Sequence, residues 1–275
     1  MKKRVLALLA AVAVVLGAAA LIVPKGLQRE PDDWELTDFE GCFEEAYPTE
    51  KEEYPLLEGT EEENTACVLK GAGKGPTVYI VAGVHGDEQA GWRAGNLLKD
   101  ATLKAGTLYI VSPANLYGAQ ADQRRTKEDR DLNRNFPGDP NGCDAERIAW
   151  SIYSDAADKD PVLVLDLHEA IAKEDDYEAL GANYDALGNS IICQDITEIG
   201  DLVMEVILAS EAGELCSGKL TLYGSPPVRS VNRVMTLELG IPTITVETLR
   251  AEPLAQRVQN QLELVQFVLE YYGMR

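Results

Sequence analysis

The sequence predicts a single α/β domain, built on a mostly parallel, mixed central sheet with helices on both faces. Short runs of apolar and β-branched residues, bounded by Gly, Pro or Asp, have the composition of buried strands. Amphipathic segments of helical length separate these runs, and the two kinds of segment alternate along the chain. This alternation indicates right-handed strand–helix–strand units, whose ligands bind at the carboxyl ends of the strands.

The first residues, 1–27, are expected to form a membrane anchor or signal segment. Lys2, Lys3 and Arg4 precede residues 5–23, which are uncharged and mostly apolar. This run is long enough for a membrane-spanning helix of about 17–25 residues and longer than the apolar region of about 7–15 in a cleaved signal. The preceding positive charges place the domain outside the cytoplasm. Small residues at 18–20 keep cleavage and secretion open as the alternative.

Residues 28–64 are expected to be an acidic linker and lead-in. They are rich in Glu and Asp, contain Pro31, Pro48 and Pro55, and show no sustained period. The domain itself is therefore expected to cover residues 65–275.

The predicted strands and helices of this domain alternate. Gly240 and Pro242 illustrate the boundaries, because glycine caps helices and proline cannot continue them. The predicted strands are Thr77–Ala82, Thr107–Val111, Val162–Leu167 and Thr243–Val246. The predicted helices are Asp87–Lys99, Asp144–Ala157, Glu198–Ala212, Val231–Leu239 and Pro253–Tyr272.

Composition excludes several functions. The formal net charge is −21, and no extended basic patch follows the N-terminal segment, so nucleic acid is not an expected partner. Contact with a membrane is expected through the N-terminal segment only. The five cysteines include no CxxC pair, so neither a structural zinc knuckle nor a full disulfide framework is indicated. A single disulfide outside the cell stays open.

Two histidines and a glutamate have the spacing of metal ligands. His85 and Glu88 follow the strand at 77–82, and His168 follows the strand at 162–167. The carboxyl ends of parallel strands meet at one edge of a sheet, so these side chains should lie together. Two histidines and one glutamate leave a position on zinc open for water, which suits hydrolysis. A single histidine at either position would more simply be a hydrogen-bonded surface or core residue. Two histidines with a matching glutamate favour instead a site for one zinc ion per chain.

Other polar residues are predicted at the same edge. Glu247 follows the strand at 243–246 and could move a proton from water to a leaving nitrogen, or be a surface glutamate. Asp166 could orient the imidazole of His168, or cap backbone groups. The arginine-rich loop 123–138 could bind a carboxylate or an oxyanion, or form a solvated salt-bridge surface.

Together these segments resemble the zinc carboxypeptidase superfamily, and within it the succinylglutamate desuccinylase/aspartoacylase branch. The short interval between Glu88 and His168 favours this branch over digestive-type carboxypeptidases. The resemblance covers residues from about 65 to 270. Its motifs are His85-Gly86-Asp87-Glu88, the DLNRNFPG sequence from Asp131 to Gly138, Asp166-Leu167-His168 and Ile244-Thr245-Val246-Glu247.

The resemblance implies a zinc hydrolase that cleaves an amide bond adjacent to a carboxylate, with Glu247 as general base and acid. It also implies an arginine that polarises the scissile carbonyl. The motif does not decide which of the two adjacent arginines, Arg124 or Arg125, has this role. We assign the catalytic role to Arg125 and substrate binding to Arg124.

Three further residues are implied to bind substrate. Asn133 and Arg134 match the pair that holds the substrate carboxylate. Tyr223, beside Gly-Ser-Pro, is the counterpart of the substrate-capping tyrosine or a simple turn residue. The expected substrate is a small acyl amino acid or a peptide.

Other functions stay open on the sequence. A metallocarboxypeptidase-like protein acting on cell-wall peptides would suit an exported enzyme. A non-catalytic module could hold peptides in the same groove, with zinc structural or absent. A serine or cysteine hydrolase is disfavoured, because the chain has no GxSxG sequence and both histidines serve the metal.

Overall fold

The computed structural model describes residues 34–171 and 187–275. The predicted N-terminal segment at 1–27 therefore lies outside the described residues. Residues 35–275 form one compact unit. In the described ranges, no helix combines the length and apolar character that crossing a bilayer requires. All five cysteines lie in the described ranges and are free thiols.

One mixed sheet of eight strands forms the centre of this unit, in the order β1-β2-β4-β3-β5-β8-β6-β7. Strands β4, β3, β5 and β8 run parallel, whereas β1 and β2 join antiparallel at one edge and β6 lies antiparallel to β8. The predicted fold class is confirmed. The strands are Thr49–Leu56 (β1), Asn64–Gly71 (β2), Gly73–Ala82 (β3), Ala105–Val111 (β4), Leu163–Ala170 (β5), Ser190–Cys193 (β6), Thr221–Tyr223 (β7) and Thr243–Leu249 (β8).

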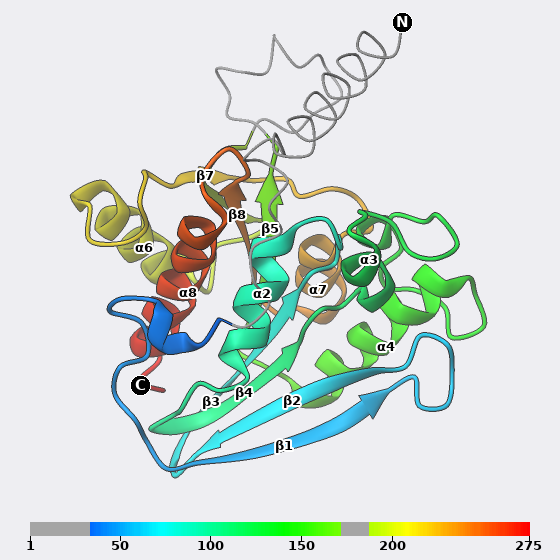
Figure 1. Ribbon diagram of the computed structural model, residues 1–275, viewed down its shortest axis with the longest axis horizontal. Coiled ribbons are helices and arrows are strands. Elements are labelled where there is room, and N and C mark those ends of the chain that lie inside the picture. The colour runs from blue at the N-terminus through cyan, green and yellow to red at the C-terminus, as the bar shows by residue number, and fades with distance from the viewer. Residues whose placement is uncertain (1–33, 172–186) are drawn as a thin grey trace, which may run out of the picture. The chain divides into compact units, whose positions relative to one another are not determined.

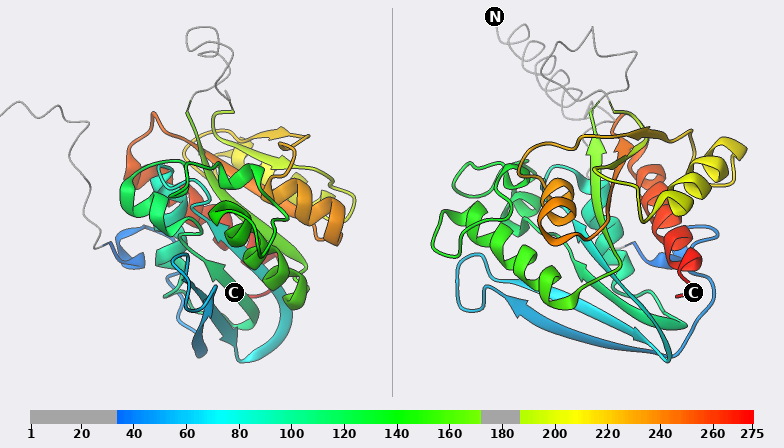
Figure 2. Two further views of the ribbon diagram at one scale, coloured as in Figure 1. Left: turned by 90° about the vertical axis from the view of Figure 1, so that its right-hand side faces the viewer. Right: turned by 180° about the vertical axis from the view of Figure 1, so that it is seen from behind.

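Helices cover both faces of the sheet. Figure 1 shows α2 and α8 on one face, and the view from behind in Figure 2 shows α4 and α7 on the other. The predicted helices all form, with α7 at its predicted bounds, and the short α3 is an addition. The helices are Gln89–Leu98 (α2), Leu116–Ala121 (α3), Asp144–Lys159 (α4), Gly200–Ala212 (α6), Val231–Leu239 (α7) and Leu254–Tyr271 (α8), with 3-10 turns at Leu36–Asp38 (η1) and Leu132–Arg134 (η2).

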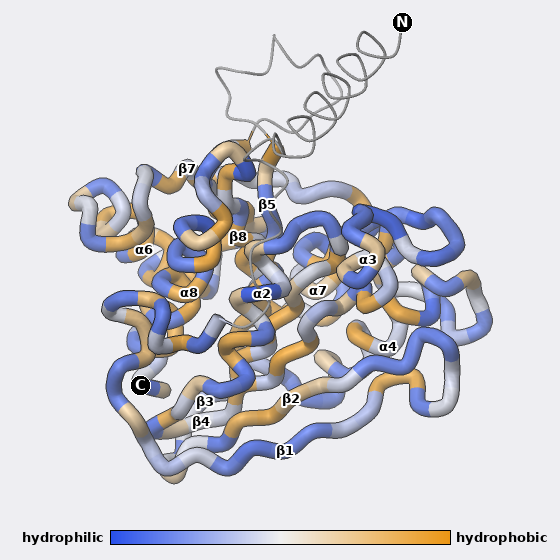
Figure 3. The backbone as a smooth tube through the Cα atoms, viewed as in Figure 1, coloured by the Kyte–Doolittle hydropathy of each residue, from blue (hydrophilic) through white to orange (hydrophobic). Residues whose placement is uncertain are grey.

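The expectation of an irregular lead-in is wrong for residues 49–56, which form β1 and pair with β2 along their whole length. Figure 3 shows that β1 is hydrophilic over most of its course. Lys51, Glu52 and Glu53 are exposed on consecutive positions, so neither face of the strand has an apolar period. Charged side chains are common on edge strands because they discourage pairing with other chains. Because of these charges, the sequence of β1 lacks the apolar alternation from which a strand is predicted.

Candidate active site

The three predicted metal ligands come together at one edge of the sheet. His85 lies in the loop after β3, Glu88 directly precedes α2, and His168 lies near the carboxyl end of β5. All three are buried, and their ligand atoms lie within 4.8 Å of one another. Nδ1 of His85 is 2.7 Å from Glu88 Oε1, and Nδ1 of His168 is 2.7 Å from Glu88 Oε2. This group could bind a metal ion.

Close packing of the loop between β3 and α2 holds two of these residues in place. A Cβ atom on Gly86 would lie 1.9 Å from the carbonyl carbon of Gly118 in α3, so the two backbones touch. Only glycine permits this approach. The loop therefore presents His85 and Glu88 from a fixed backbone, one at each side of Gly86.

A carboxylate lies behind each histidine. Nε2 of His85 is 3.1 Å from Asp131 Oδ1, and Nε2 of His168 is 3.0 Å from Asp166 Oδ1. Such outer carboxylates turn the opposite ring nitrogen toward a metal and raise its basicity. Both Nδ1 atoms do lie on the side of Glu88. The 3.0 Å distance agrees with the predicted position of Asp166 beside the His168 ring, whereas the contact of Asp131 with His85 was not predicted.

The site favours negative charge on its carboxylates. Burial would raise the pKa of Glu88, but attraction and hydrogen bonding from His85 and His168 outweigh it and hold this pKa well below its usual range. Burial opposes ionisation of Asp131 as well, and His85 together with Arg124 keeps its pKa low. A buried, ionised Glu88 beside two imidazoles matches the donor set that zinc prefers.

The ligand group opens onto a cleft of about 540 Å³. Most residues predicted to handle substrate line this cleft, and Arg125 does not. Residues in the carboxyl-terminal halves of β5 and β8 line the cleft, in agreement with the general position of ligand sites in parallel sheets. The predicted residues in its wall are His85, Glu88, Arg124, Asn133, Arg134, His168, Tyr223 and Glu247.

Glu247 stands next to the metal ligands without being one of the three. It lies on β8, where it pairs in register with His168 of β5, and its side chain is largely buried. A carboxylate in this position can exchange protons with a molecule bound in the cleft.

The two neighbouring arginines have different surroundings. The Arg124 guanidinium lies 3.1 Å from Asp131 and 3.4 Å from Glu88, and it lines the cleft. The Arg125 side chain is 53% exposed and donates to the backbone oxygen of Asp129. The position of Arg125 therefore gives no support to the catalytic role assigned from the sequence, and the arginine at the site is Arg124.

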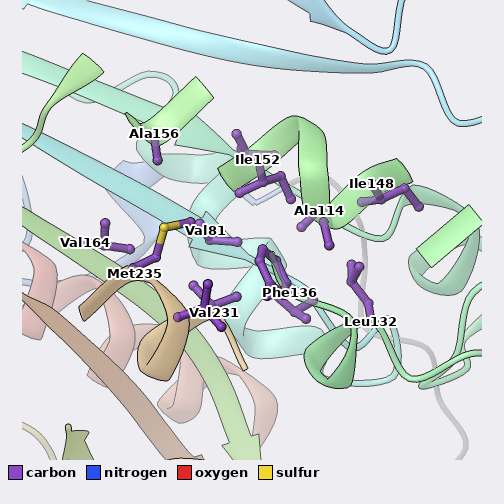
Figure 4. Packing of buried hydrophobic residues seen from close by; sticks show 14 of the residues in the cluster. Val81, Ala114, Leu132, Phe136, Ile148, Ile152, Ala156, Val164, Val231 and Met235 are labelled. Carbon is purple, nitrogen blue, oxygen red and sulfur yellow. The ribbon is translucent and has the colours of Figure 1, made fainter. Parts of the chain in front are cut away.

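The DLNRNFPG loop is held by its apolar residues. Figure 4 shows Leu132 and Phe136 in the core beside Val231, and both are fully buried. Between them, the Asn133 side chain accepts a hydrogen bond from the backbone of Val231 through Oδ1, and its Nδ2 is 3.4 Å from His168 Nε2. Arg134 donates to the Asn133 carbonyl. The packing of this loop thus fixes Asn133 and Arg134 at the cleft.

One positively charged residue near the ligands was missed. Arg250 follows β8, and its guanidinium lies 3.0 Å from Asp87 and 3.6 Å from Glu88. It ties the ligand loop to the end of the β8 strand. No spacing signal connects positions this far apart in sequence, so only the fold reveals the contact.

Comparisons with known proteins agree with this geometry. The model of the succinylglutamate desuccinylase/aspartoacylase catalytic domain matches residues 74–271. The chain belongs to this family. Proteins named in the family are amide-bond hydrolases, and the resemblance inferred from the motifs is confirmed.

Particular relatives match parts of the chain. An N-α-acetyl-L-2,4-diaminobutyric acid deacetylase of Halomonas elongata is 38% identical over 101 residues, which are 35% of this chain and 29% of that protein. A succinylglutamate desuccinylase/aspartoacylase structure from Rhodobacter sphaeroides has a TM-score of 0.61 at 21% identity, covering 83% of this chain and 66% of that one. A tripeptide-bound cell shape determinant protein Csd4 from Helicobacter pylori has a TM-score of 0.61 at 18% identity, covering 83% and 56%. These structures share the fold.

Proposed function

We propose that the protein is a zinc-dependent hydrolase that cleaves an amide bond next to a carboxylate, in an N-acyl amino acid or a peptide. The observation that carries this proposal is the buried group of His85, Glu88 and His168, which opens onto a cleft with Glu247 at its wall. Membership of a family of amide-bond hydrolases supports the same reaction class.

Each residue at the metal end of the cleft has a role in this reaction. Zinc held by His85, Glu88 and His168 would polarise the scissile carbonyl and make water a better nucleophile. Glu247 takes the proton from the attacking water and passes it to the leaving nitrogen. Arg124 donates hydrogen bonds to the carbonyl oxygen as negative charge develops on it.

Three other residues of the cleft wall position the substrate. Arg134 and Asn133 hold the substrate carboxylate, because a guanidinium and an amide N–H group both suit carboxylate oxygens. Tyr223, on β7, lines the same cleft and contacts the bound substrate. Fixing the carboxylate aligns the amide with Glu247, which lowers the entropic cost of reaction.

Metal content and chelator sensitivity test this function. Plasma mass spectrometry of the purified chain should find about one zinc per chain. Release of an amine from N-acyl amino acids or peptides should stop with a chelator and return with zinc. A protein that binds no metal after zinc is added, or one that hydrolyses equally well without metal, would contradict the proposal.

The two arginines provide a sharper test of the site. Arg124→Ala is expected to lower kcat by about 100- to 1000-fold, the usual effect of removing one oxyanion donor. Arg125→Ala is expected to change kcat little, because its exposed guanidinium binds the backbone of Asp129. Zinc content is measured for both variants, since Arg124 also approaches Glu88. A larger loss in Arg125→Ala would restore the assignment made from the sequence.

We also propose that residues 1–27 hold the catalytic domain outside the cytoplasmic membrane. The charged residues at 2–4 and the apolar run at 5–23 support this localisation. After an alkaline wash, cell membranes should retain the full chain, and protease added outside the cytoplasm should digest it. Recovery of a shorter, freely released chain would show instead that the segment is cleaved.

A further inference from the structure

The side chain of Glu88 does not cap α2, although Glu88 holds the capping position before this helix. A residue in that position commonly accepts a hydrogen bond from one of the first backbone N–H groups of the helix. The Glu88 carboxylate turns instead toward His85 and His168. Because a buried N–H group without an acceptor is costly, the first turn of α2 needs an acceptor from elsewhere in the fold.

Glu169 supplies this acceptor from the neighbouring strand β5. Its Oε2 atom accepts a hydrogen bond of 3.1 Å from the backbone N–H group of Ala90, in the first turn of α2. Its own backbone N–H group donates to Oε2 of Glu88, also at 3.1 Å. Glu169 therefore holds the ligand Glu88 directly and also fixes the helical turn that follows it.

Helix α8 holds the Glu169 carboxylate in this position. Helices α2 and α8 lie side by side on one face of the sheet (Figure 1), and the guanidinium of Arg257 in α8 forms an ion pair with Oε1 of Glu169. The Glu169 side chain is fully buried, and that of Arg257 is 14% exposed. Removing one partner of such a pair leaves the other as an uncompensated buried charge. Without Arg257, we expect the Glu169 carboxylate to turn away from Ala90 and toward the cleft, whose wall it joins.

A second residue of α8 reaches the strand that carries His168. Gln261 lies one turn after Arg257, on the same side of the helix. Its side chain is fully buried, and its Nε2 atom donates to the backbone oxygen of His168 at 2.8 Å and to Oγ1 of Thr248 at 3.2 Å. These bonds fix the β5 backbone at the ligand and connect it to β8.

We propose, resting on the zinc site of the function proposed above, that Arg257 and Gln261 are positioning residues of the metal centre. Arg257 acts through Glu169 on Glu88, and Gln261 acts through the backbone of His168. Neither residue lies in the cleft wall, so neither contacts the substrate. Metal–ligand distances tolerate deviations of only about 0.2 Å, so a small displacement of either ligand weakens metal binding.

Zinc affinity of Arg257→Met tests the first of these roles. Competition with a chromophoric chelator is measured on the full chain, at a temperature at which circular dichroism shows each metal-free variant to be folded. The affinity should fall by about 10- to 100-fold, the usual effect of losing a residue that orients a metal ligand. Arg257→Lys should lose less, because an ammonium group can still pair with Glu169. Unchanged affinity in Arg257→Met overturns the role of Arg257.

The matched control is Arg147→Met, the same substitution in an ion pair on the other face of the sheet. Arg147 belongs to α4, and its guanidinium lies 2.6 Å from Glu62. This variant should keep the zinc affinity of the wild-type protein. An equal loss of affinity in Arg147→Met and Arg257→Met would show a general effect of lost ion pairs, and would overturn the proposal.

A double variant tests whether Arg257 acts through Glu169. Glu169→Ala alone should weaken zinc binding, because it removes the acceptor for Ala90. Adding Arg257→Met to Glu169→Ala should lower the affinity little further, since two residues that act through one contact have non-additive effects. A full additional loss in the double variant would overturn this route.

Gln261→Leu tests the second role in the same assay. Leucine fills a similar volume but cannot donate to the His168 carbonyl, so a loss of zinc affinity of about 10- to 100-fold is expected. Unchanged affinity overturns the role of Gln261.

Failure of this inference differs from failure of the proposed function. A wild-type protein that binds one zinc ion and hydrolyses amides, with unaltered zinc affinity in Arg257→Met and Gln261→Leu, overturns the inference alone. A wild-type protein that binds zinc but hydrolyses no amide overturns the proposed function, and weaker zinc binding by both variants would still support the positioning roles. A wild-type protein that binds no zinc overturns both.

Discussion

Replacing Glu247 with glutamine is expected to lower kcat by about 100- to 10,000-fold while zinc stays bound. Glutamine has nearly the same shape as glutamate but cannot accept the proton of the attacking water. The residue pairs in register with His168 but is not one of the three clustered ligands, so the metal group should keep its donors. Rates of amine release and zinc content, measured on the same preparation, check both parts of this result.

The matched control is Glu238→Gln, the same chemical change on the exposed surface of α7. It should leave both kcat and zinc content unchanged. A Glu247→Gln protein that retains wild-type activity would disprove the assigned proton transfer, and the zinc centre would then need another base. Loss of zinc from Glu247→Gln would instead show that this carboxylate is itself a ligand.

The centre of the sheet could be predicted from the sequence because its strands are apolar on both faces. Strands β5 and β8 are buried throughout and β3 over its second half, so each contains a short apolar run. The strands that were not predicted give a weaker signal in the sequence. Strand β1 is charged on both faces, and β6 and β7 span only 190–193 and 221–223. Strand β2 was not predicted either, because its buried run at 66–69 is only four residues long.

The candidate site, too, could be predicted only in part. His85, Glu88 and His168 could be found because each closely follows or ends a buried strand and is of a metal-binding type. Contacts between distant positions could not be found. Asp131 meets His85 across 46 positions, and Arg250 meets Asp87 across 163. The sequence also could not decide which of two adjacent arginines, Arg124 or Arg125, lies at the site.

The choice between Arg124 and Arg125 shows why. Both precede the DLNRNFPG loop and have the same chemistry, so the motif cannot tell which one turns inward. The structure separates them through their partners, since Arg124 reaches Asp131 and Glu88 while Arg125 reaches the exposed Asp129. Side-chain direction in an irregular loop depends on tertiary contacts rather than on local period.

Replacing His168 with alanine is expected to abolish stoichiometric zinc binding and, with it, amide hydrolysis. The change removes one of three clustered donors, and no other histidine is present besides His85. Asp166→Asn should have a smaller effect, because Asp166 acts on the metal only through the His168 ring. Loss of such an outer carboxylate typically weakens metal affinity by about 10- to 100-fold. Competition with a chromophoric chelator measures both affinities, and circular dichroism checks that each variant folds.

The relative size of these two effects distinguishes a direct metal ligand from a carboxylate that only orients one. If His168 binds the metal and Asp166 only orients it, the alanine variant must lose far more affinity than the asparagine variant, and His85→Ala must resemble His168→Ala. A His168→Ala protein with wild-type zinc affinity would place the metal elsewhere. If Asp166→Asn lost as much affinity as His168→Ala, the carboxylate would be a direct ligand, and the donor set would no longer be two histidines and Glu88.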